Sequence, residues 1–228
     1  MKKIAVLTYN VPHQKTFDIL MNLYVKGYRD IEVYSTPMGY KKKFKPLLEH
    51  RPSLRYDLSP IELCRILGFK YNPNIDEIFN LPENTIFLIA GSNILEKNLT
   101  DKYKVVNSHP GIIPLVRGLD AFKWALYEGL PIGVTVHLVT GQVDSGPIIL
   151  QRTISIDKFE TFHSLALKLY DLEVHSLIDS IKILDTHLIN EFTKVDDSNS
   201  LPRKRMPKII EQDLINRFVC ILGHSDAK

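Results

Sequence analysis

Cysteine is scarce in this chain, and long apolar runs are missing. The two cysteines among 228 residues, Cys64 and Cys220, lie far apart and lack the spacing of a metal site. A disulfide-rich scaffold is therefore excluded, and a reducing compartment is indicated. The apolar run at residues 4–7 is too short for a signal sequence, and no stretch approaches the roughly 20 apolar residues that span a bilayer. We expect a cytoplasmic protein without a membrane partner.

Charge of one sign is also scarce, because 29 basic and 26 acidic side chains leave a net charge of +3. That balance is too small to indicate a nucleic-acid partner. Hydrophobic residues make up 44% of the chain, which is typical of a globular protein with a sizeable core. The length corresponds to one domain with at most a small appendage.

The beginning of the chain alternates strands with a helix. Residues 4–7 form a continuous apolar run, as expected for a strand that is buried on both faces. Phe17, Leu20, Met21 and Tyr24 then recur at helical spacing, and Gly27 follows as a helix stop. Residues 31–34 have the pattern of a second strand. This β-α-β order predicts a parallel sheet with a right-handed crossover.

Later segments continue this pattern. Ser59, Pro60 and Glu62 form a capping box with proline at the first helical position, which predicts a helix that ends near Gly68. We expect strands over residues 86–90, 104–107, 134–139 and 148–156, and helices over residues 121–129 and 161–184. The predicted fold class is α/β, with a Rossmann-like, mostly parallel, twisted sheet flanked by helices. Residues 186–228 would form a short C-terminal extension that packs on the core or serves a homodimer.

An amide, an imidazole and a carboxylate stand near the ends of predicted strands. Asn107 and His109 are two residues apart, so their side chains can point the same way. Asp144 follows the next strand, and ligand sites in parallel sheets lie outside the carboxyl ends of strands. Asn107 can stabilise an oxyanion, His109 can act as base and then acid, and Asp144 can support the imidazole. Such a set can catalyse acyl transfer to an amine.

Each of these residues also has an ordinary structural interpretation. Asn-x-His is common on its own, and Asp144 precedes Ser-Gly-Pro as a turn residue would. His137 lies on an alternating strand, where a histidine is more often packed and hydrogen-bonded than catalytic. His109, His137 and Asp144 have the chemistry of metal ligands, but they lack a pair on one helical turn, so we expect no metal.

The ordered set of motifs over residues 105–156 resembles the catalytic core of the formyltransferases that use N10-formyltetrahydrofolate. The resemblance weakens over the first 100 residues. The shared pattern consists of Asn-Ser-His-Pro-Gly-Ile-Ile-Pro from Asn107, Arg117-Gly118, Trp124, Gly-Val-Thr-Val-His ending at His137, Asp-Ser-Gly-Pro from Asp144, and Gln151. The combination is far more specific than any of its parts.

The resemblance implies a role for each of these residues. Asn107, His109 and Asp144 would form the catalytic triad within a catalytic domain at residues 1–185, and His137 would support them without touching the substrate. N10-formyltetrahydrofolate would be the co-substrate, and the transfer needs no metal. Its pteridine would contact Phe87, Leu88, Ile89, Ala90, Gly91, Ile94, Val139, Thr140 and Gly141.

Three branches of the family differ in the amine that accepts the formyl group. Glycinamide ribonucleotide transformylase has a glycine-rich loop for phosphate after its first strand, whereas residues 9–13 here contain no glycine. Methionyl-tRNA formyltransferase has a sizeable basic C-terminal domain, whereas the basic run here, residues 203–205, is short. The third branch formylates a nucleotide-linked amino sugar for surface polysaccharide.

By exclusion we expect the acceptor to be a small-molecule nucleotide sugar, specifically a dTDP-4-amino-4,6-dideoxy sugar. Tyr9, Asn10, Arg117 and Gly118 are expected to contact it. The glycinamide ribonucleotide and methionyl-tRNA branches remain alternatives. A catalytically silent folate-binding homologue is the alternative from outside the enzymes, and the intact triad argues against it.

Overall fold

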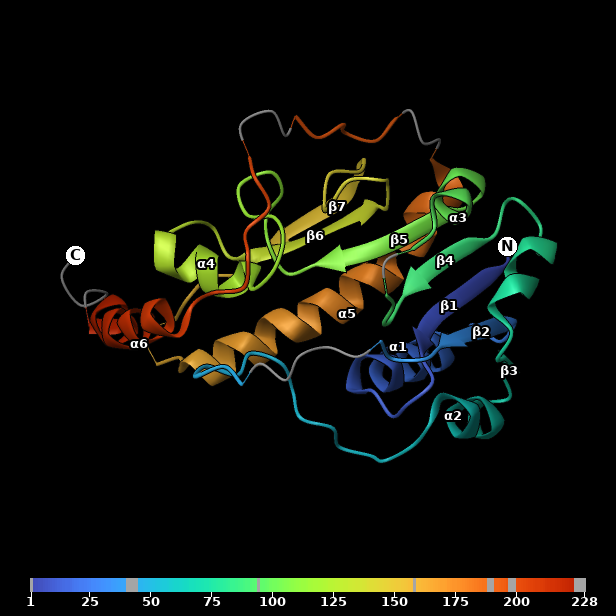
Figure 1. Ribbon diagram of the computed structural model, residues 1–228, viewed down its shortest axis with the longest axis horizontal. Helices are drawn as coiled ribbons and strands as arrows, with labels where there is room; N and C mark the ends of the chain where they lie inside the picture. Colours follow the sequence, from blue (N-terminus) through green and yellow to red (C-terminus); the bar gives the residue numbers. More distant parts are fainter. Residues whose placement is uncertain are drawn as a thin grey trace.

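The computed structural model describes residues 2–39, 45–93, 95–157, 159–187, 191–196 and 200–223 (Figure 1). Strands and helices alternate along most of the chain. The strands are β1 Ile4–Tyr9, β2 Ile31–Thr36, β3 Lys70–Asn72, β4 Ile86–Ile89, β5 Lys104–His109, β6 Gly133–Leu138 and β7 Ile148–Thr153. The helices are α1 Gln14–Val25, α2 Pro60–Leu67, the 3-10 helix η1 Ile75–Asn80, α3 Lys97–Lys102, α4 Ala121–Glu128, α5 Phe162–Thr186 and α6 Lys208–Gly223.

The strands form one sheet with the order β3-β2-β1-β4-β5-β6-β7. Neighbouring strands from β3 to β5 are parallel, whereas β6 runs antiparallel to β5 and β7 antiparallel to β6. The predicted mostly parallel α/β fold is therefore confirmed. The chain runs outward from β1 to β3 and then returns to β4, so the strand order reverses between β1 and β4. Ligands of such sheets bind outside the carboxyl ends of the strands at this point.

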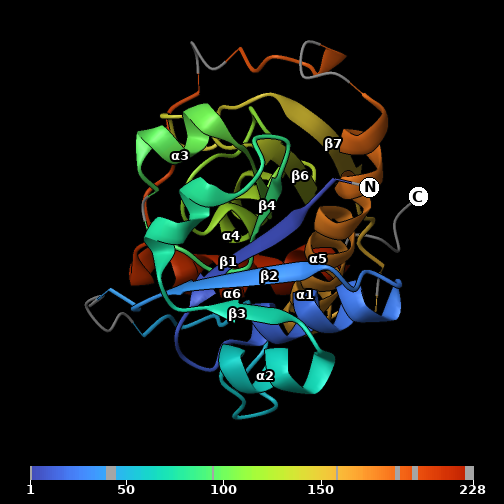
Figure 2. The same ribbon diagram turned by 90° about the vertical axis from the view of Figure 1, so that its right-hand side faces the viewer.

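Both faces of the sheet are covered, which explains the fully apolar strands. Ile4 and Val6 pack into the core cluster that includes residues of α1, α4 and α5, whereas Ala5 and Leu7 pack into a second cluster with residues of η1 and α3. Figure 2 shows α1 and α5 on one side of the strands and α3 on the other. Alternate residues of one strand thus enter different cores.

Several predicted strand ends differ from the structure by one to three residues, and strand pairing explains two of these differences. The strand expected to stop at residue 107 continues to His109, because β6 pairs with it as far as His109 opposite Thr135. The strand expected to reach residue 156 ends at Thr153, which lies opposite Gly133, the first residue of β6. The structure also contains β3 and η1, which the sequence pattern did not predict. The capping box at Ser59 and the left-handed Gly68 after α2 are present as predicted.

The C-terminal extension is tied to the core through α4. Lys123 of α4 and Glu211 of α6 form an ion pair in which both side chains are completely buried. A second oxygen of Glu211 accepts a hydrogen bond from the backbone N–H of Leu47 at 2.7 Å. Among the described residues, none of the helices combines the length and the apolar character that a membrane crossing requires.

Candidate active site

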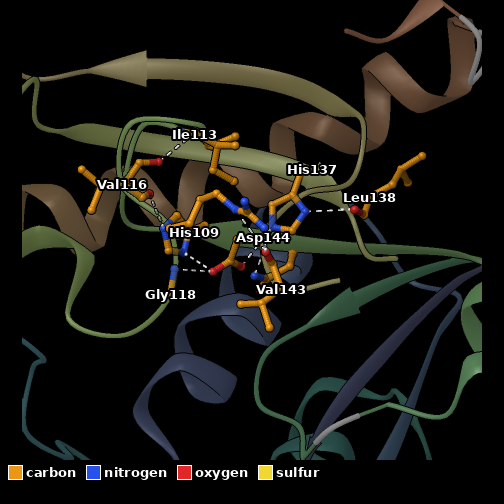
Figure 3. A network of polar contacts seen from close by, with 12 residues as sticks. His109, Ile113, Val116, Gly118, His137, Leu138, Val143 and Asp144 are labelled. Atoms are coloured by element: carbon orange, nitrogen blue, oxygen red, sulfur yellow. Dashed lines mark hydrogen bonds and ion pairs between the residues drawn. The ribbon is translucent and has the colours of Figure 1, made fainter. Parts of the chain in front are cut away.

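Asn107, His109 and Asp144 converge beside the paired strands β5 and β6. Asp144 lies on the loop after β6, and its Oδ2 is 3.4 Å from Nδ1 of His109 (Figure 3). Its Oδ1 is 3.5 Å from Nε2 of His137, the residue paired with Asn107 across the two strands. Nδ2 of Asn107 is 3.5 Å from the same Nε2. The residues that were expected to act together therefore lie together, with His137 between Asn107 and Asp144.

The hydrogen bonds of His109 define which nitrogen can take up a proton. Its Nε2 lies 3.0 Å from the carbonyl oxygen of Val116, which can only accept, so this nitrogen carries the hydrogen. The lone pair of the neutral ring is then on Nδ1, which faces Asp144. The ring is 4% exposed, and burial lowers the pKa of His109 although the Asp144 carboxylate opposes that shift. His109 is therefore neutral and basic near pH 7.

A glycine makes room for this imidazole. A Cβ atom on Gly111 would lie 2.8 Å from Nε2 of His109 and 2.8 Å from the carbonyl oxygen of Val116. Any side chain at this position would therefore force apart the hydrogen bond that sets the tautomer of His109.

Asp144 is held as an anion. Burial raises the pKa of its carboxyl group, but His137, His109 and the backbone N–H of Gly118 outweigh that effect and lower the pKa to about 2. The Gly118 N–H donates to Oδ2 of Asp144 at 2.9 Å. A proton taken up by Nδ1 of His109 would therefore lie beside a fixed negative charge.

His137 orients the same group from the next strand. Its Nδ1 lies 2.9 Å from the carbonyl oxygen of Leu138, so this nitrogen carries a hydrogen. Its Nε2 faces both the amide of Asn107 and the carboxylate of Asp144. His137 is 2% exposed, and its supporting role stays a prediction.

A cleft of about 520 Å³ opens in front of these side chains. Asn107, His137 and Asp144 line its catalytic end. Four of the residues expected to contact folate also line the cleft: Ile89, Val139, Thr140 and Gly141. Leu95 and other residues of the loop before α3 complete the lining. The volume is in the range of pockets that enclose a small ligand.

The other residues expected to contact folate lie elsewhere. Phe87 and Leu88 are fully buried, because β4 is a central strand whose two faces are covered by different cores. Ala90 and Gly91 line a second cleft. Ile94 lies outside the described residues.

The second cleft, of about 550 Å³, has a cationic wall. Lys15 of α1 and Arg51 line it together with Tyr9, His13 and Tyr170. Both cations form ion pairs with Glu173 of α5. Nζ of Lys15 lies 2.6 Å from Oε1 of Glu173, and the Arg51 guanidinium contacts Oε2. Burial raises the pKa of Glu173, but Arg51 and Lys15 reverse this and lower it to about 2. Ile89 lines both clefts, so the two meet at the end of β4.

Tyr9 spans the boundary between the two clefts. Its hydroxyl donates to the carbonyl oxygen of Ser92 at 2.7 Å, and a Cβ atom on Gly91 would lie 2.8 Å from its ring. Tyr9 lines the second cleft and bonds to Ser92, which lines the first, and its contact with the acceptor stays a prediction. Asn10 is exposed, and its backbone N–H donates to the carbonyl oxygen of Thr36.

Arg117 and Gly118 differ from the expected substrate contacts. The side chain of Arg117 is buried, and its guanidinium donates to the carbonyl oxygens of Val143 and Ser200. Gly118 donates to Asp144 rather than facing either cleft. Sequence reasoning also missed Lys15, Arg51 and Glu173. The available signal was Glu173, a carboxylate on the apolar face of a helix, which needs a buried cation as partner.

The chain matches known proteins over the segment that carries this site. Residues 71–181 match the model of the family described as formyl transferase. These residues belong to the formyl transferase family. The formyl transferase segment includes Asn107, His109, His137 and Asp144 as well as most of the first cleft.

Relatives of the formyl transferase segment differ in the acceptor that their names give. The chain is 36% identical over 139 residues to methionyl-tRNA formyltransferase of Thermotoga maritima, covering 60% of this chain and 43% of that protein. It is 34% identical over 103 residues to phosphoribosylglycinamide formyltransferase of Bacillus subtilis, covering 43% of this chain and 53% of that protein. The chain thus spans about half, or less, of the length of these relatives.

A solved N-formyltransferase from Helicobacter canadensis has the same fold. It was crystallised with folinic acid and dTDP-3-aminofucose, and it superposes with a TM-score of 0.61. The match covers 91% of this chain and 73% of that chain at 16% identity. At 16% identity this similarity supports the fold alone, over the formyl transferase segment and the parts of the chain on either side of it.

Proposed function

We propose that this protein transfers the formyl group of N10-formyltetrahydrofolate to the primary amine of a nucleotide-linked amino sugar. The observation that carries the proposal is the convergence of Asn107, His109 and Asp144, of which Asn107 and Asp144 line a cleft together with Ile89 and residues 139–143. A second, cationic cleft meets the first at Ile89. One cleft would hold the formyl donor and the other the acceptor.

The side chains present can carry out each part of the transfer. The amine nitrogen attacks the formyl carbon, and the amide of Asn107 donates a hydrogen bond to the oxygen that becomes negative. Nδ1 of His109 takes the proton that the amine loses, and Asp144 at 3.4 Å stabilises the imidazolium. That proton then passes to the folate nitrogen as its bond to the formyl carbon breaks. No metal is needed for this sequence of steps.

Lys15 and Arg51 support an acceptor that carries phosphate. Two cations in one cleft of about 550 Å³ suit a diphosphate, and the buried Glu173 keeps both in place. The loop after β1 contains no glycine, so backbone N–H groups are less accessible to a phosphate and side-chain cations take that role. The dTDP-3-aminofucose named for the complex from Helicobacter canadensis is an amino sugar that carries a diphosphate of this kind.

We propose a dTDP-4-amino-4,6-dideoxy sugar as the acceptor, with the product used in surface polysaccharide. Methionyl-tRNA is the second candidate, because proteins named methionyl-tRNA formyltransferase share up to 36% identity with the chain. Glycinamide ribonucleotide is the third, because of the relative from Bacillus subtilis.

A panel of acceptors tests the proposal. The purified protein is mixed with N10-formyltetrahydrofolate and, separately, with dTDP-4-amino and dTDP-3-amino sugars, glycinamide ribonucleotide or methionyl-tRNA, and folate absorbance is followed. The expected result is the highest kcat/KM with a dTDP-amino sugar. Turnover with only one of the other acceptors would overturn the proposal that the acceptor is a dTDP-amino sugar. Folate binding without turnover of any amine would favour a catalytically silent homologue.

His109→Asn tests the chemistry separately from binding. This variant should bind folate normally and lose at least about a hundredfold in kcat. The matched control is His175→Asn on the exposed face of α5, which should retain the wild-type rate. A near wild-type rate in His109→Asn would exclude this residue as the base.

A further inference from the structure

We infer that Arg117 and the C-terminal segment at residues 200–206 position the Asp144 carboxylate. We call residues 200–206 the strap. The inference rests on the proposed function for the role of Asp144 in the reaction. The geometry itself consists of hydrogen bonds that reach Asp144 from its backbone side and from its side-chain side.

Arg117 holds the backbone next to Asp144. Its Nη2 and Nε donate to the carbonyl oxygen of Val143, at 2.6 Å and 3.2 Å. Val143 directly precedes Asp144, whose φ of 47° lies in the left-handed region that side chains other than glycine rarely adopt. Such a conformation persists only when surrounding bonds hold it. Arg117 supplies two of these bonds, and Figure 3 shows Val143 and Asp144 beside His109 and His137.

The same guanidinium connects Asp144 to the strap. Nη1 of Arg117 donates to the carbonyl oxygen of Ser200 at 2.6 Å, and the hydroxyl of Ser200 contacts the carbonyl oxygen of Pro114. With 4% exposure and all three of its nitrogens donating to backbone carbonyls, Arg117 is placed to fix a loop rather than to meet a ligand phosphate.

The strap also aims the N–H of Gly118 at the carboxylate. Arg203 N–H donates to the carbonyl oxygen of Arg117 at 2.8 Å, and Leu119 N–H donates to that of Arg203 at 2.9 Å. These bonds fix the residues on both sides of Gly118, whose own N–H donates to Oδ2 of Asp144 at 2.9 Å. The strap passes so close that a Cβ atom on Gly118 would lie 2.4 Å from the carbonyl oxygen of Arg203.

The strap is anchored on α4. Nε1 of Trp124 donates to the carbonyl oxygen of Lys204 at 2.8 Å. The buried Met206 donates its N–H to Oδ2 of Asp120 at 2.9 Å. Arg203 pairs with Glu128 at 2.7 Å. Figure 1 shows the segment running alongside the loop between β5 and α4 before it enters α6.

The C-terminal extension therefore contributes to the active site without lining it. Arg117 fixes the backbone of Asp144, and the strap fixes the N–H that its carboxylate accepts. Loss of either should rotate the carboxylate away from Nδ1 of His109. The expected result is a slower reaction with a much smaller change in binding, because Arg117 itself lines neither cleft and reaches the first cleft only through the backbone of Val143.

Arg117→Met and Arg117→Lys test the first half of the inference. Arg117→Met should lose about a hundredfold in kcat, as a displacement of about 1 Å can cause, with KM for donor and acceptor nearly unchanged. Arg117→Lys should recover part of this loss. The control is Arg152→Met, which removes an arginine that bonds to Ser176 and Asp179 instead. It should keep the wild-type rate.

Gly118→Ala and Gly27→Ala test the strap. The two glycines have φ values of +86° and +88°, so both substitutions introduce similar backbone strain, but a Cβ atom on Gly27 would meet nothing within 4 Å. A larger loss of kcat in Gly118→Ala than in Gly27→Ala would therefore come from contact with Arg203. Equal kcat in the two variants would overturn the role of the strap.

NMR titration of His109 provides a readout that does not depend on turnover. Displacement of Asp144 should lower the pKa of His109 below its wild-type value in Arg117→Met and Gly118→Ala, because the carboxylate that raises this pKa moves away. His137 and Glu173, the other titratable side chains that act on the ring, are unchanged in these variants. An unshifted His109 pKa in folded protein would overturn the inference, even if thermal stability fell. If the wild-type protein transfers no formyl group, this titration alone decides.

Discussion

Asp144→Asn is the most informative change, because it removes one charge and leaves the shape of the side chain. Oδ2 of Asp144 is 3.4 Å from Nδ1 of His109. At an effective dielectric constant of about 20, two unit charges at that distance attract by roughly 5 kcal/mol. Partial exposure of Asp144 reduces the interaction, so about 3–5 kcal/mol of imidazolium stabilisation should be lost. This corresponds to about two to four decades in kcat.

The direction of the pH shift follows from the same contact. The carboxylate raises the pKa of His109 against the lowering effect of burial. Its removal should lower that pKa further, so the acid limb of the kcat/KM profile should move to lower pH while the plateau falls. A neutral histidine would thus persist to lower pH, but it would be a weaker base.

The assay is the pH dependence of kcat/KM for formyl release, measured for the wild type, Asp144→Asn and a control. Asp179→Asn is the control, because this carboxylate of α5 pairs with Lys26 and Arg152. It should leave both the plateau and the acid limb in place. An Asp144→Asn plateau within fivefold of the wild type, together with an unmoved acid limb, would refute the coupling of Asp144 to His109.

Three further predictions concern the oxyanion, the C-terminal helix and acid stability. Asn107→Ala should raise the activation barrier by roughly 3 kcal/mol and so lower kcat, with little change in KM. Steady-state kinetics that showed only a rise in KM would contradict an oxyanion role. Glu211→Gln removes one buried carboxylate from Lys123 and leaves Asp120, 3.3 Å away, as the remaining charged partner, so it should lower the free energy of unfolding by about 3 kcal/mol, whereas Asp213→Asn, on the partly exposed side of α6, should cost under about 1 kcal/mol. Denaturant titration measures both, and equal losses would count against the buried pair. Because the pKa of Glu173 is about 2 when folded and 4.5 ordinarily, its contribution to stability should be complete above pH 4.5 and disappear as the pH falls toward 2. The melting temperature should depend less steeply on pH over that range in Glu173→Gln than in the wild type. An identical slope would contradict the contribution of ionised Glu173 to stability.

The local sequence pattern was sufficient to predict features that depend on a single helix or strand. The apolar run at residues 4–7 and the helical spacing after it predicted the β-α-β start. A strand that is buried on both faces is apolar throughout, whereas a helix that is buried on one face repeats its apolar residues every three or four positions. The capping box at Ser59 predicted the start of α2. Asn107 and His109 could be placed on one face of a strand because side chains repeat every two residues.

Contacts between distant segments were beyond the reach of local pattern. Arg51 comes from a stretch without periodicity, and its partner Glu173 follows 122 residues later. Arg117 was expected at the substrate because it is a cation next to the triad motif, yet it is buried against Val143 and Ser200. Burial and partner choice depend on which segments meet, and residue type does not encode that.

The amino-acid sequence alone determined which functional groups are available, namely an amide, an imidazole and a carboxylate at Asn107, His109 and Asp144, which are the groups that the proposed formyl transfer requires. The tertiary structure decided that they do meet, and which other groups hold them. A carboxylate in a left-handed loop keeps its direction only through bonds to neighbours in space. Here those neighbours come from the loop before α4, which the strap at residues 200–206 holds in turn.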